Sequence, residues 1–132
     1  MRANGIIIRK SGASVKDTVD QIVEFLRNHG ATVYARIDQQ SEALKSGLEL
    51  PPLEFLLFGN PTKGALIMKE NILSALDLPL KIIAWTDSDG QSWVAFNDVS
   101  YLSSRFELIA DKDSPLDLSP MVDYLLKNQT HP

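Results

Sequence analysis

The chain of 132 residues contains no cysteine and only two histidines. Without cysteine it can have no disulfide, no thiolate nucleophile and no zinc or iron–sulfur site with cysteine ligands. His29 falls at the end of a predicted helix, and His131 falls beside the C-terminus. Neither a histidine metal cluster nor a Ser-His-Asp arrangement fits that placement, so we predict no metal site and no cofactor.

The sequence also lacks a long hydrophobic run and an excess of basic residues. Its first apolar stretch is the three isoleucines Ile6–Ile8, far shorter than a signal peptide or a membrane span requires. With 13 Lys and Arg against 17 Asp and Glu, the net charge is −4, which argues against binding to nucleic-acid backbones. We therefore expect a cytoplasmic protein without nucleic-acid or membrane partners, and the absence of cysteine fits that compartment.

The residues that are present suffice for a single domain spanning residues 1–132. Hydrophobic residues make up 44% of the chain, enough to bury roughly two thirds of the surface that the unfolded chain exposes. The order of strand and helix patterns predicts an α+β fold, with a mixed, mostly antiparallel sheet of about five strands and helices on one face. The expected strands are 5–9, 32–38, 53–58, 80–85 and 92–97, and the expected helices are 15–29, 41–46, 62–76 in two parts, 101–106 and 116–128.

Local patterns add detail at both ends of the first helix and in the second strand. Ser14 is expected to cap the first helix, and His29 is expected to contact the carbonyl groups at its end. In the second strand Val33, Ala35 and Ile37 alternate with more polar residues, so we predict that these three form its buried face.

The stretch Asp87–Gly90 predicts a hairpin turn that makes the last two strands antiparallel. A calcium loop does not fit here, because it would put Trp85 at the first ligand position and Phe96 at the last. Trp85 and Trp93 lie on either side of the turn. Packing of this pair for stability is the preferred interpretation, and stacking on a ligand is the alternative.

The strand and helix borders in the middle of the chain resemble those of a known family. The run Leu53–Pro61 ends an apolar strand and begins a helix, and Leu76–Lys81 ends that helix and leads into the next strand. Further segments that match in order and spacing are Ala35–Asp38, Gly47–Leu50, Ile67–Met68, Trp93 and Phe96–Asp98. The pattern resembles the bacterial and archaeal family known as domain of unknown function 302, best over residues 31–105, with the helix at 116–128 outside the match. The resemblance implies an α+β fold and no established activity.

The chain departs from that family's pattern in three places. Gln39 stands where the family usually has His, Ala65 stands where it has Thr, and Phe96–Val99 stands where it has Tyr-Asn-Asp-Pro. A mechanism that needs the histidine therefore does not carry over to this chain.

The segment Gly59–Gly64 is a candidate ligand site. A helix N-terminus offers free backbone N–H groups and the positive end of the helix dipole, and Lys63 adds a positive charge. Asn60, Thr62 and Lys63 are the expected contacts of a small anion. Capping alone is the preferred interpretation, because Asn60 is a favoured N-cap and Pro61 suits the first helical position.

Asp38 is the candidate for a catalytic base, because it ends a strand on the more polar face. Antiparallel pairing of the second and third strands places Asp38 and Asn60 at opposite ends of the sheet. If the following helix returns the chain to the Leu53 end, Asn97 and Asp98 approach Asp38 and form a polar ligand site with it. The preferred alternative is that these side chains cap the helices that follow them.

No set of nucleophile, base and electrophile converges in this sequence. The predicted helices can cover only one face of the sheet, so the second face needs a partner. We therefore predict a cytoplasmic, self-associating module, a homodimer, that binds a small ligand or a protein partner. The alternative is an enzyme or ligand-responsive protein acting on a small anionic or carbonyl compound, with Asp38 as base and Lys63 binding charge.

Overall fold

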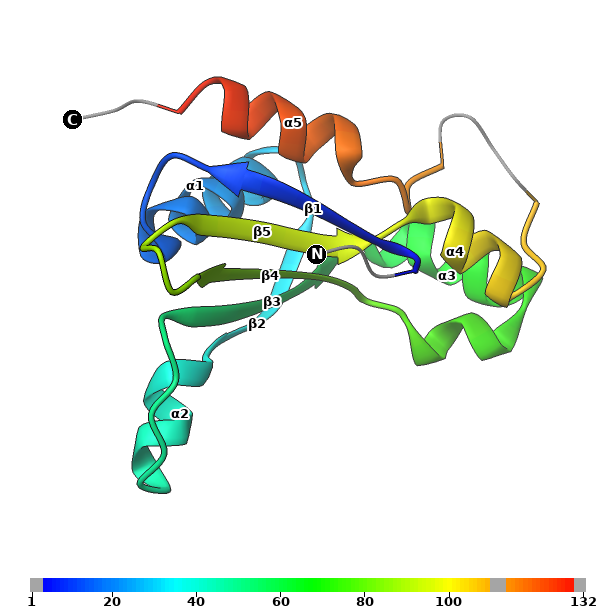
Figure 1. Ribbon diagram of the computed structural model, residues 1–132. Coiled ribbons are helices and arrows are strands. Elements are labelled where there is room, and N and C mark those ends of the chain that lie inside the picture. Colours follow the sequence, from blue (N-terminus) through cyan, green and yellow to red (C-terminus); the bar gives the residue numbers. More distant parts are fainter. Residues whose placement is uncertain (1–3, 110–113, 130–132) are drawn as a thin grey trace.

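The computed structural model describes residues 4–109 and 114–129 (Figure 1). The strands are β1 (Ile6–Ser11), β2 (Thr32–Asp38), β3 (Leu53–Gly59), β4 (Leu80–Thr86) and β5 (Ser92–Asn97). The helices are α1 (Val15–Asn28), α2 (Gln39–Lys45), α3 (Pro61–Glu70), the 3₁₀ helix η1 (Ile72–Leu76), α4 (Val99–Arg105) and α5 (Ser119–Lys127). The strands form one sheet against which helices pack, and this confirms the α+β class.

The strands lie in the order β1-β5-β4-β3-β2, and every pairing among them is antiparallel. The sheet is therefore antiparallel throughout rather than mixed. β1 and β2 form its edges. The predicted hairpin turn joins β4 to β5, and in it Asp87 Oδ1 accepts hydrogen bonds from the backbone N–H groups of Asp89 and Gln91, both at 2.9 Å.

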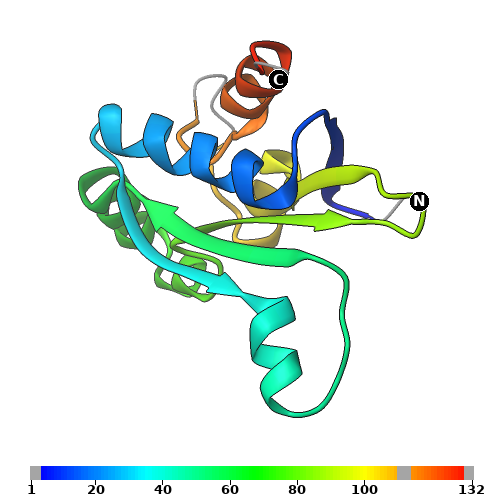
Figure 2. The ribbon, with the colours of Figure 1, turned by 90° about the vertical axis from the view of Figure 1, so that its left-hand side faces the viewer.

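One face of the sheet is covered by α1, with α5 beside it (Figure 2). Ser14 Oγ caps α1 by accepting from Asp17 N at 3.0 Å, and His29 Nδ1 lies 2.8 Å from Phe25 O, as predicted. The core between α1 and the sheet is mainly apolar, and the buried hydroxyls of Ser11 and Thr18 at its margin are hydrogen-bonded to each other at 2.7 Å. Its members include Val15, Val19, Ile22, Val23 and Leu26 of α1, Leu56 and Phe58 of β3, Ile82 of β4, and Val94 and Phe96 of β5.

The helices α3, η1 and α4 gather at one end of the sheet, on the right of Figure 1. Asn71 joins two of them, since its Oδ1 accepts from Leu73 N in η1 and its Nδ2 donates to Phe106 O after α4. Because η1 folds back beside α3, this connection ends near where it began. β4 consequently enters next to β3, with Leu80 opposite Phe58.

At the other end of the sheet, α2 and the loop after it form an arm, residues 39–52, that projects from the body (Figures 1 and 2). Asp38 caps α2, since its Oδ1 accepts from Ser41 N at 2.9 Å. Gly47 follows the helix with a φ of 77°, a conformation that glycine adopts without strain. No residue of α2 is buried.

The second strand differs from its prediction. Val33, Ala35 and Ile37 do not share a face, because the register with β3 shifts between Val33 and Ala35. Val33 pairs with Phe58 and packs against the core, whereas Ala35 and Ile37 lie on the opposite face of the sheet. This bulge turns Arg36 toward α1.

Candidate functional site

Asn60 lies where β3 ends and α3 begins, and its Oδ1 accepts from Lys63 N at 3.0 Å. With Pro61 in the first position of the helix, the predicted cap is confirmed. A cavity of about 110 Å³ opens beside it, and its walls are mainly apolar. The lining includes Tyr34, Lys63, Ile67, Met68, Leu78 and Leu80. Binding of an anion by Asn60, Thr62 and Lys63 stays a prediction.

The predicted cluster of Asp38, Asn97 and Asp98 is wrong. Asp38 stands at the arm end of the sheet, and Asn97 stands at the end where α3 and α4 gather. The prediction assumed that β4 begins beside Leu53, but the fold-back of η1 starts it beside Phe58. Asn97 and Asp98 therefore share an end of the sheet with the α3 cap and not with Asp38.

Both aspartates of that expected cluster cap helices. Asp98 Oδ1 accepts from the backbone N–H of Ser100 at 3.0 Å and from its hydroxyl at 2.9 Å, which caps α4. Asp38 caps α2 through Ser41 N. The capping interpretation is confirmed for both residues, and so is the placement of Asp38 and Asn60 at opposite ends of the sheet.

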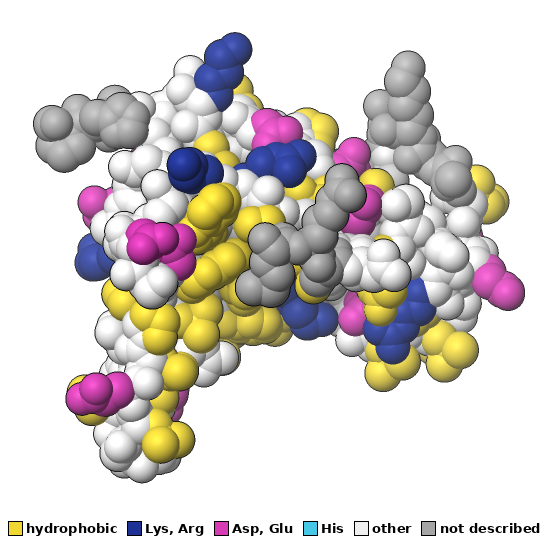
Figure 3. Space-filling view, in the orientation of Figure 1, with side chains coloured by type: hydrophobic (Ala, Val, Ile, Leu, Met, Phe, Trp, Pro, Cys, Tyr) yellow, Lys and Arg dark blue, Asp and Glu magenta, His cyan; other side chains and the backbone are white. Residues whose placement is uncertain are grey.

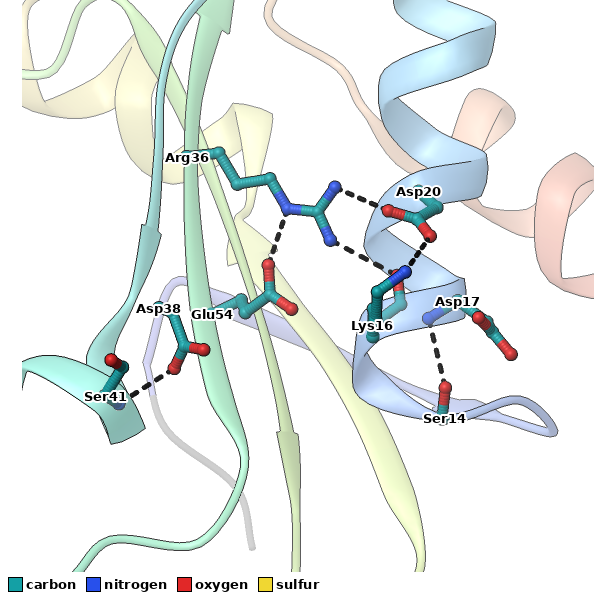
Figure 4. Close-up of polar contacts among 8 residues, drawn as sticks. All are labelled: Ser14, Lys16, Asp17, Asp20, Arg36, Asp38, Ser41 and Glu54. Carbon is teal, nitrogen blue, oxygen red and sulfur yellow. Dashed lines mark hydrogen bonds and ion pairs between the residues drawn. The ribbon is translucent and has the colours of Figure 1, made fainter. Parts of the chain in front are cut away.

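A chain of ion pairs joins α1 to β2 and β3 (Figure 4). Arg36 Nε donates to Glu54 Oε1, and Arg36 Nη1 donates to Asp20 Oδ1, both at 2.6 Å. Arg36 Nη2 donates to the main-chain oxygen of Lys16 at 3.3 Å. Lys16 Nζ lies 2.9 Å from Asp20 Oδ2. All three guanidinium nitrogens of Arg36 are thus engaged.

Glu54 is the buried member of this network, with a side chain only 10% exposed, against 44% for Asp20. The hydrogen bond that Arg36 donates to Glu54 raises the pKa of Arg36, and the bond to Asp20 adds to the rise. Hydrogen bonds from Lys16 and Arg36 lower the pKa of the Asp20 carboxyl. Because a buried carboxylate is costly unless it is paired, the network fixes β2 and β3 against α1.

A hollow of about 300 Å³ lies beside Glu54, and its lining includes Ser14, Lys16, Asp38, Gln40, Leu53 and Thr86. Its charged groups already have partners: Glu54 contacts Arg36, Lys16 contacts Asp20, and Asp38 caps α2. We assign this corner a structural role. Sequence reasoning missed the network, although a signal was present, because Glu54 is the single charged residue in the apolar run Leu53–Phe58 and such a charge needs a partner.

The second face of the sheet has no helix over it in the part of the chain that the structure describes, and most of its side chains are apolar. One row across the strands consists of Ile37, Phe55, Ile83, Ala95 and Ile8, and the next consists of Leu53, Trp85, Trp93 and Lys10. Ile83, on an inner strand, is 36% exposed. Figure 3 shows hydrophobic side chains gathered over this face and continuing onto the arm. We call this surface the open face.

A hollow of about 170 Å³ lies in the open face, lined by Ile6, Phe55, Lys81, Ile83, Ala95, Phe96 and Asn97. Beside it, Trp85 and Trp93 are cross-strand partners. Trp93 Nε1 donates to Asp87 Oδ2 at 2.7 Å, and this bond, followed by the N–H of Gln91, lowers the pKa of Asp87. These contacts support the interpretation of the tryptophan pair as packing.

Within residues 4–109 and 114–129, no three side chains of His, Asp or Glu are grouped so that they could hold a metal ion. Among the helices of those same ranges, none has the length and apolar character needed to cross a membrane.

The sequence and the fold agree with one family. The sequence model of the family "Domain of unknown function DUF302" matches residues 7–117. Because this range is most of the chain, the protein belongs to that family. A crystal structure of an uncharacterized conserved DUF302 protein from Bacillus stearothermophilus has the same fold, with a TM-score of 0.78 at 20% identity over 95% of this chain and 98% of the other.

Curated relatives also match, over part of their length. The chain is 34% identical over 110 residues to the fluoride-specific ion channel FluC 1 of Brucella suis biovar 1 (strain 1330), a match that covers 83% of this chain and 43% of the relative. The fluoride-specific ion channel FluC 1 of Brucella abortus biovar 1 (strain 9-941) matches equally, with 41% of its length covered. The chain therefore spans about two fifths of these relatives.

Proposed function

We propose that the protein is a self-associating binding module of the cytoplasm, which forms a homodimer through the open face. The observation that carries this proposal is an apolar sheet face at the surface, with Phe55 and Ile83 at its centre. Large contiguous apolar patches on a folded protein mark interaction sites, because water leaves them favourably when a partner covers them.

The polar side chains that could take part in a reaction are already engaged in structural contacts, and this favours binding over catalysis. A side-chain oxygen of Asp38, of Asn60 and of Asp98 accepts the hydrogen bond that caps a helix. Arg36 and Glu54 are occupied by each other. A general base needs a free position near a substrate proton, together with a group that orients it. The contacts of these side chains favour structural roles for all of them.

The names of the fluoride-channel relatives describe whole chains, of which the matched part is less than half. We therefore propose no channel activity for the present chain, and the self-association proposed for it rests on the open face alone.

Light scattering on two matched variants tests the proposal. Ile83→Asp places a charge in the centre of the open face, and we expect it to convert a dimer into a monomer. Ile72→Asp, on exposed η1, is the control and should keep the parent mass. Circular dichroism of both variants shows whether they are folded. If folded Ile83→Asp keeps the dimer mass, or if Ile72→Asp alone loses it, the open face is not the interface.

A further inference from the structure

We propose that the arm, residues 39–52, of one subunit packs onto the open face of a second copy of the chain, which returns the same contact. This inference rests on the proposed dimer and specifies how it is built. In such a twofold arrangement each subunit supplies one arm and receives one, so the interface closes without leaving a free binding edge.

The arm carries apolar side chains that its own subunit does not cover. Leu44 and Leu48 are 64% and 65% exposed, and Leu50 is exposed as well. A helix of seven residues is far too short to be stable through its backbone hydrogen bonds alone. Packing of an apolar side against another surface is the usual source of the missing stability, and a second subunit can supply that surface.

The arm is nevertheless preformed. Asp38 caps its helix at the start. After Gly47, Leu48 N donates back to Ala43 O at 3.0 Å, and Gln40 Nε2 donates to Leu50 O at 3.1 Å across the base of the loop. A segment that is ordered before binding loses less conformational entropy when it docks, so little of the binding free energy is spent on ordering it.

The open face offers a matching receptor. Its hollow of about 170 Å³ is lined mostly by apolar side chains, and an apolar cavity of roughly 150 Å³ is large enough to admit a benzene ring. A leucine side chain of the arm therefore fits there. The projecting leucines and the hollow belong to the same molecule, which is the requirement for a surface that recognises its own copy.

Charge favours the same pairing. The arm contributes Glu42, which pairs with Lys45, and Glu49, which is exposed. The receiving face contributes Lys10 beside the Trp93 ring, and Lys81 in the wall of the hollow, whose Nζ lies 3.9 Å from Asp77 Oδ1. The net negative charge of the arm therefore meets positive charge on the face, chiefly at Lys10, an arrangement that orients two partners as they meet.

The area of the open face also indicates that the arm takes part in the interface. Five strands of six or seven residues make a face roughly 24 Å by 20 Å, a planar footprint of about 480 Å². Standard interfaces bury about 800 Å² on each partner. The sheet face alone falls short of that value, and the exposed leucines of the arm supply further apolar area next to it.

The absence of cysteine allows a direct test in the full chain by site-specific crosslinking. Subunits with Leu48→Cys are mixed with subunits with Ile83→Cys, and a short bis-maleimide is added. We expect crosslinked dimers from this mixture. A matched mixture of Leu48→Cys with Ile72→Cys, at the opposite end of the sheet, should give few. In addition, the double variant Leu44→Ser and Leu48→Ser should weaken the dimer about tenfold or more.

Two results separate this inference from the proposed function. If the double arm variant dimerises like the parent and Leu48→Cys links to Ile83→Cys no better than to Ile72→Cys, the arm does not dock there. If Ile83→Asp still converts that dimer into a monomer, the open face is the interface and the arm takes no part in it. If the parent protein itself is a monomer, both proposals are overturned.

Discussion

Phe55 on β3 and Ile83 on β4 lie directly opposite each other on the open face, while their neighbours Leu56 and Ile82 lie opposite each other in the core beneath α1. The same two strands thus present apolar side chains to both sides. In a sheet with one face exposed to solvent, the side chains on that face would be mostly polar. The apolar set on the open face is the physical basis of the proposed dimer.

The buried ion pair should matter more to stability than its exposed neighbour. We expect Glu54→Gln to lower the free energy of unfolding by about 1–3 kcal/mol, because Arg36 loses a charged partner at a poorly hydrated site. Asp20→Asn, at the exposed end of the same network, should cost less than about 1 kcal/mol. Urea unfolding curves with unchanged slopes measure both values. Equal small losses would show that the Arg36–Glu54 pair does not fasten the strands.

The second prediction concerns the contribution of the α3 cap to the free energy of unfolding. Asn60→Ala should cost about 1 kcal/mol, because Lys63 N loses its acceptor, whereas Asn60→Asp should be nearly neutral. Chemical denaturation of the two variants beside the parent decides this. An alanine variant as stable as the parent would mean that the cap contributes nothing, and a loss of several kcal/mol would point to a wider network around Asn60.

Asp38 should act locally. Asp38→Asn keeps a good N-cap and should leave the fold and the dimer unchanged, whereas Asp38→Ala should raise amide hydrogen exchange in α2. Exchange rates measured peptide by peptide show whether the effect stays within the arm. Unfolding of the whole protein or loss of the dimer in Asp38→Asn would make this residue a structural anchor and exclude it as a base.

Acid stability should depend on the hairpin turn. Because the folded pKa of Asp87 lies below its ordinary value of 3.8, the stability from its bonds is complete above that pH and is lost as the pH falls through the folded pKa. Asp87→Asn should therefore weaken the pH dependence of unfolding below about pH 4. Asp89→Asn in the same turn is the control. If the free energy of unfolding falls with decreasing pH as steeply in Asp87→Asn as in the parent, the bonds of Asp87 do not cause this pH dependence.

Much of the fold was predictable because its signals are local. The spacing of apolar residues in α1, the caps at Ser14 and Asn60 and the turn at Asp87–Gly90 each depend on a few neighbouring residues, and all are present in the structure. The apolar character of β3 on both faces was also evident, and it is the origin of the open face.

Two features depended on contacts that a single strand or helix does not reveal. The bulge after Val33 cannot be seen in the alternating pattern of apolar residues in β2. It changes only the face of the sheet on which the residues after it lie. The fold-back of η1 decides at which end of the sheet β4 begins, and this placed Asn97 away from Asp38. Both are set by packing between segments, so the predicted polar cluster was wrong although Asp38 and Asn97 were each assigned to the correct strand.

The mass of the unmodified protein in solution tests the central claim most directly. Sedimentation equilibrium from low to high micromolar concentration should give about twice the 14.7 kDa of one chain, with dissociation only at the dilute end. The mass of a single chain at every concentration, including high micromolar, would contradict self-association and leave the open face to another partner.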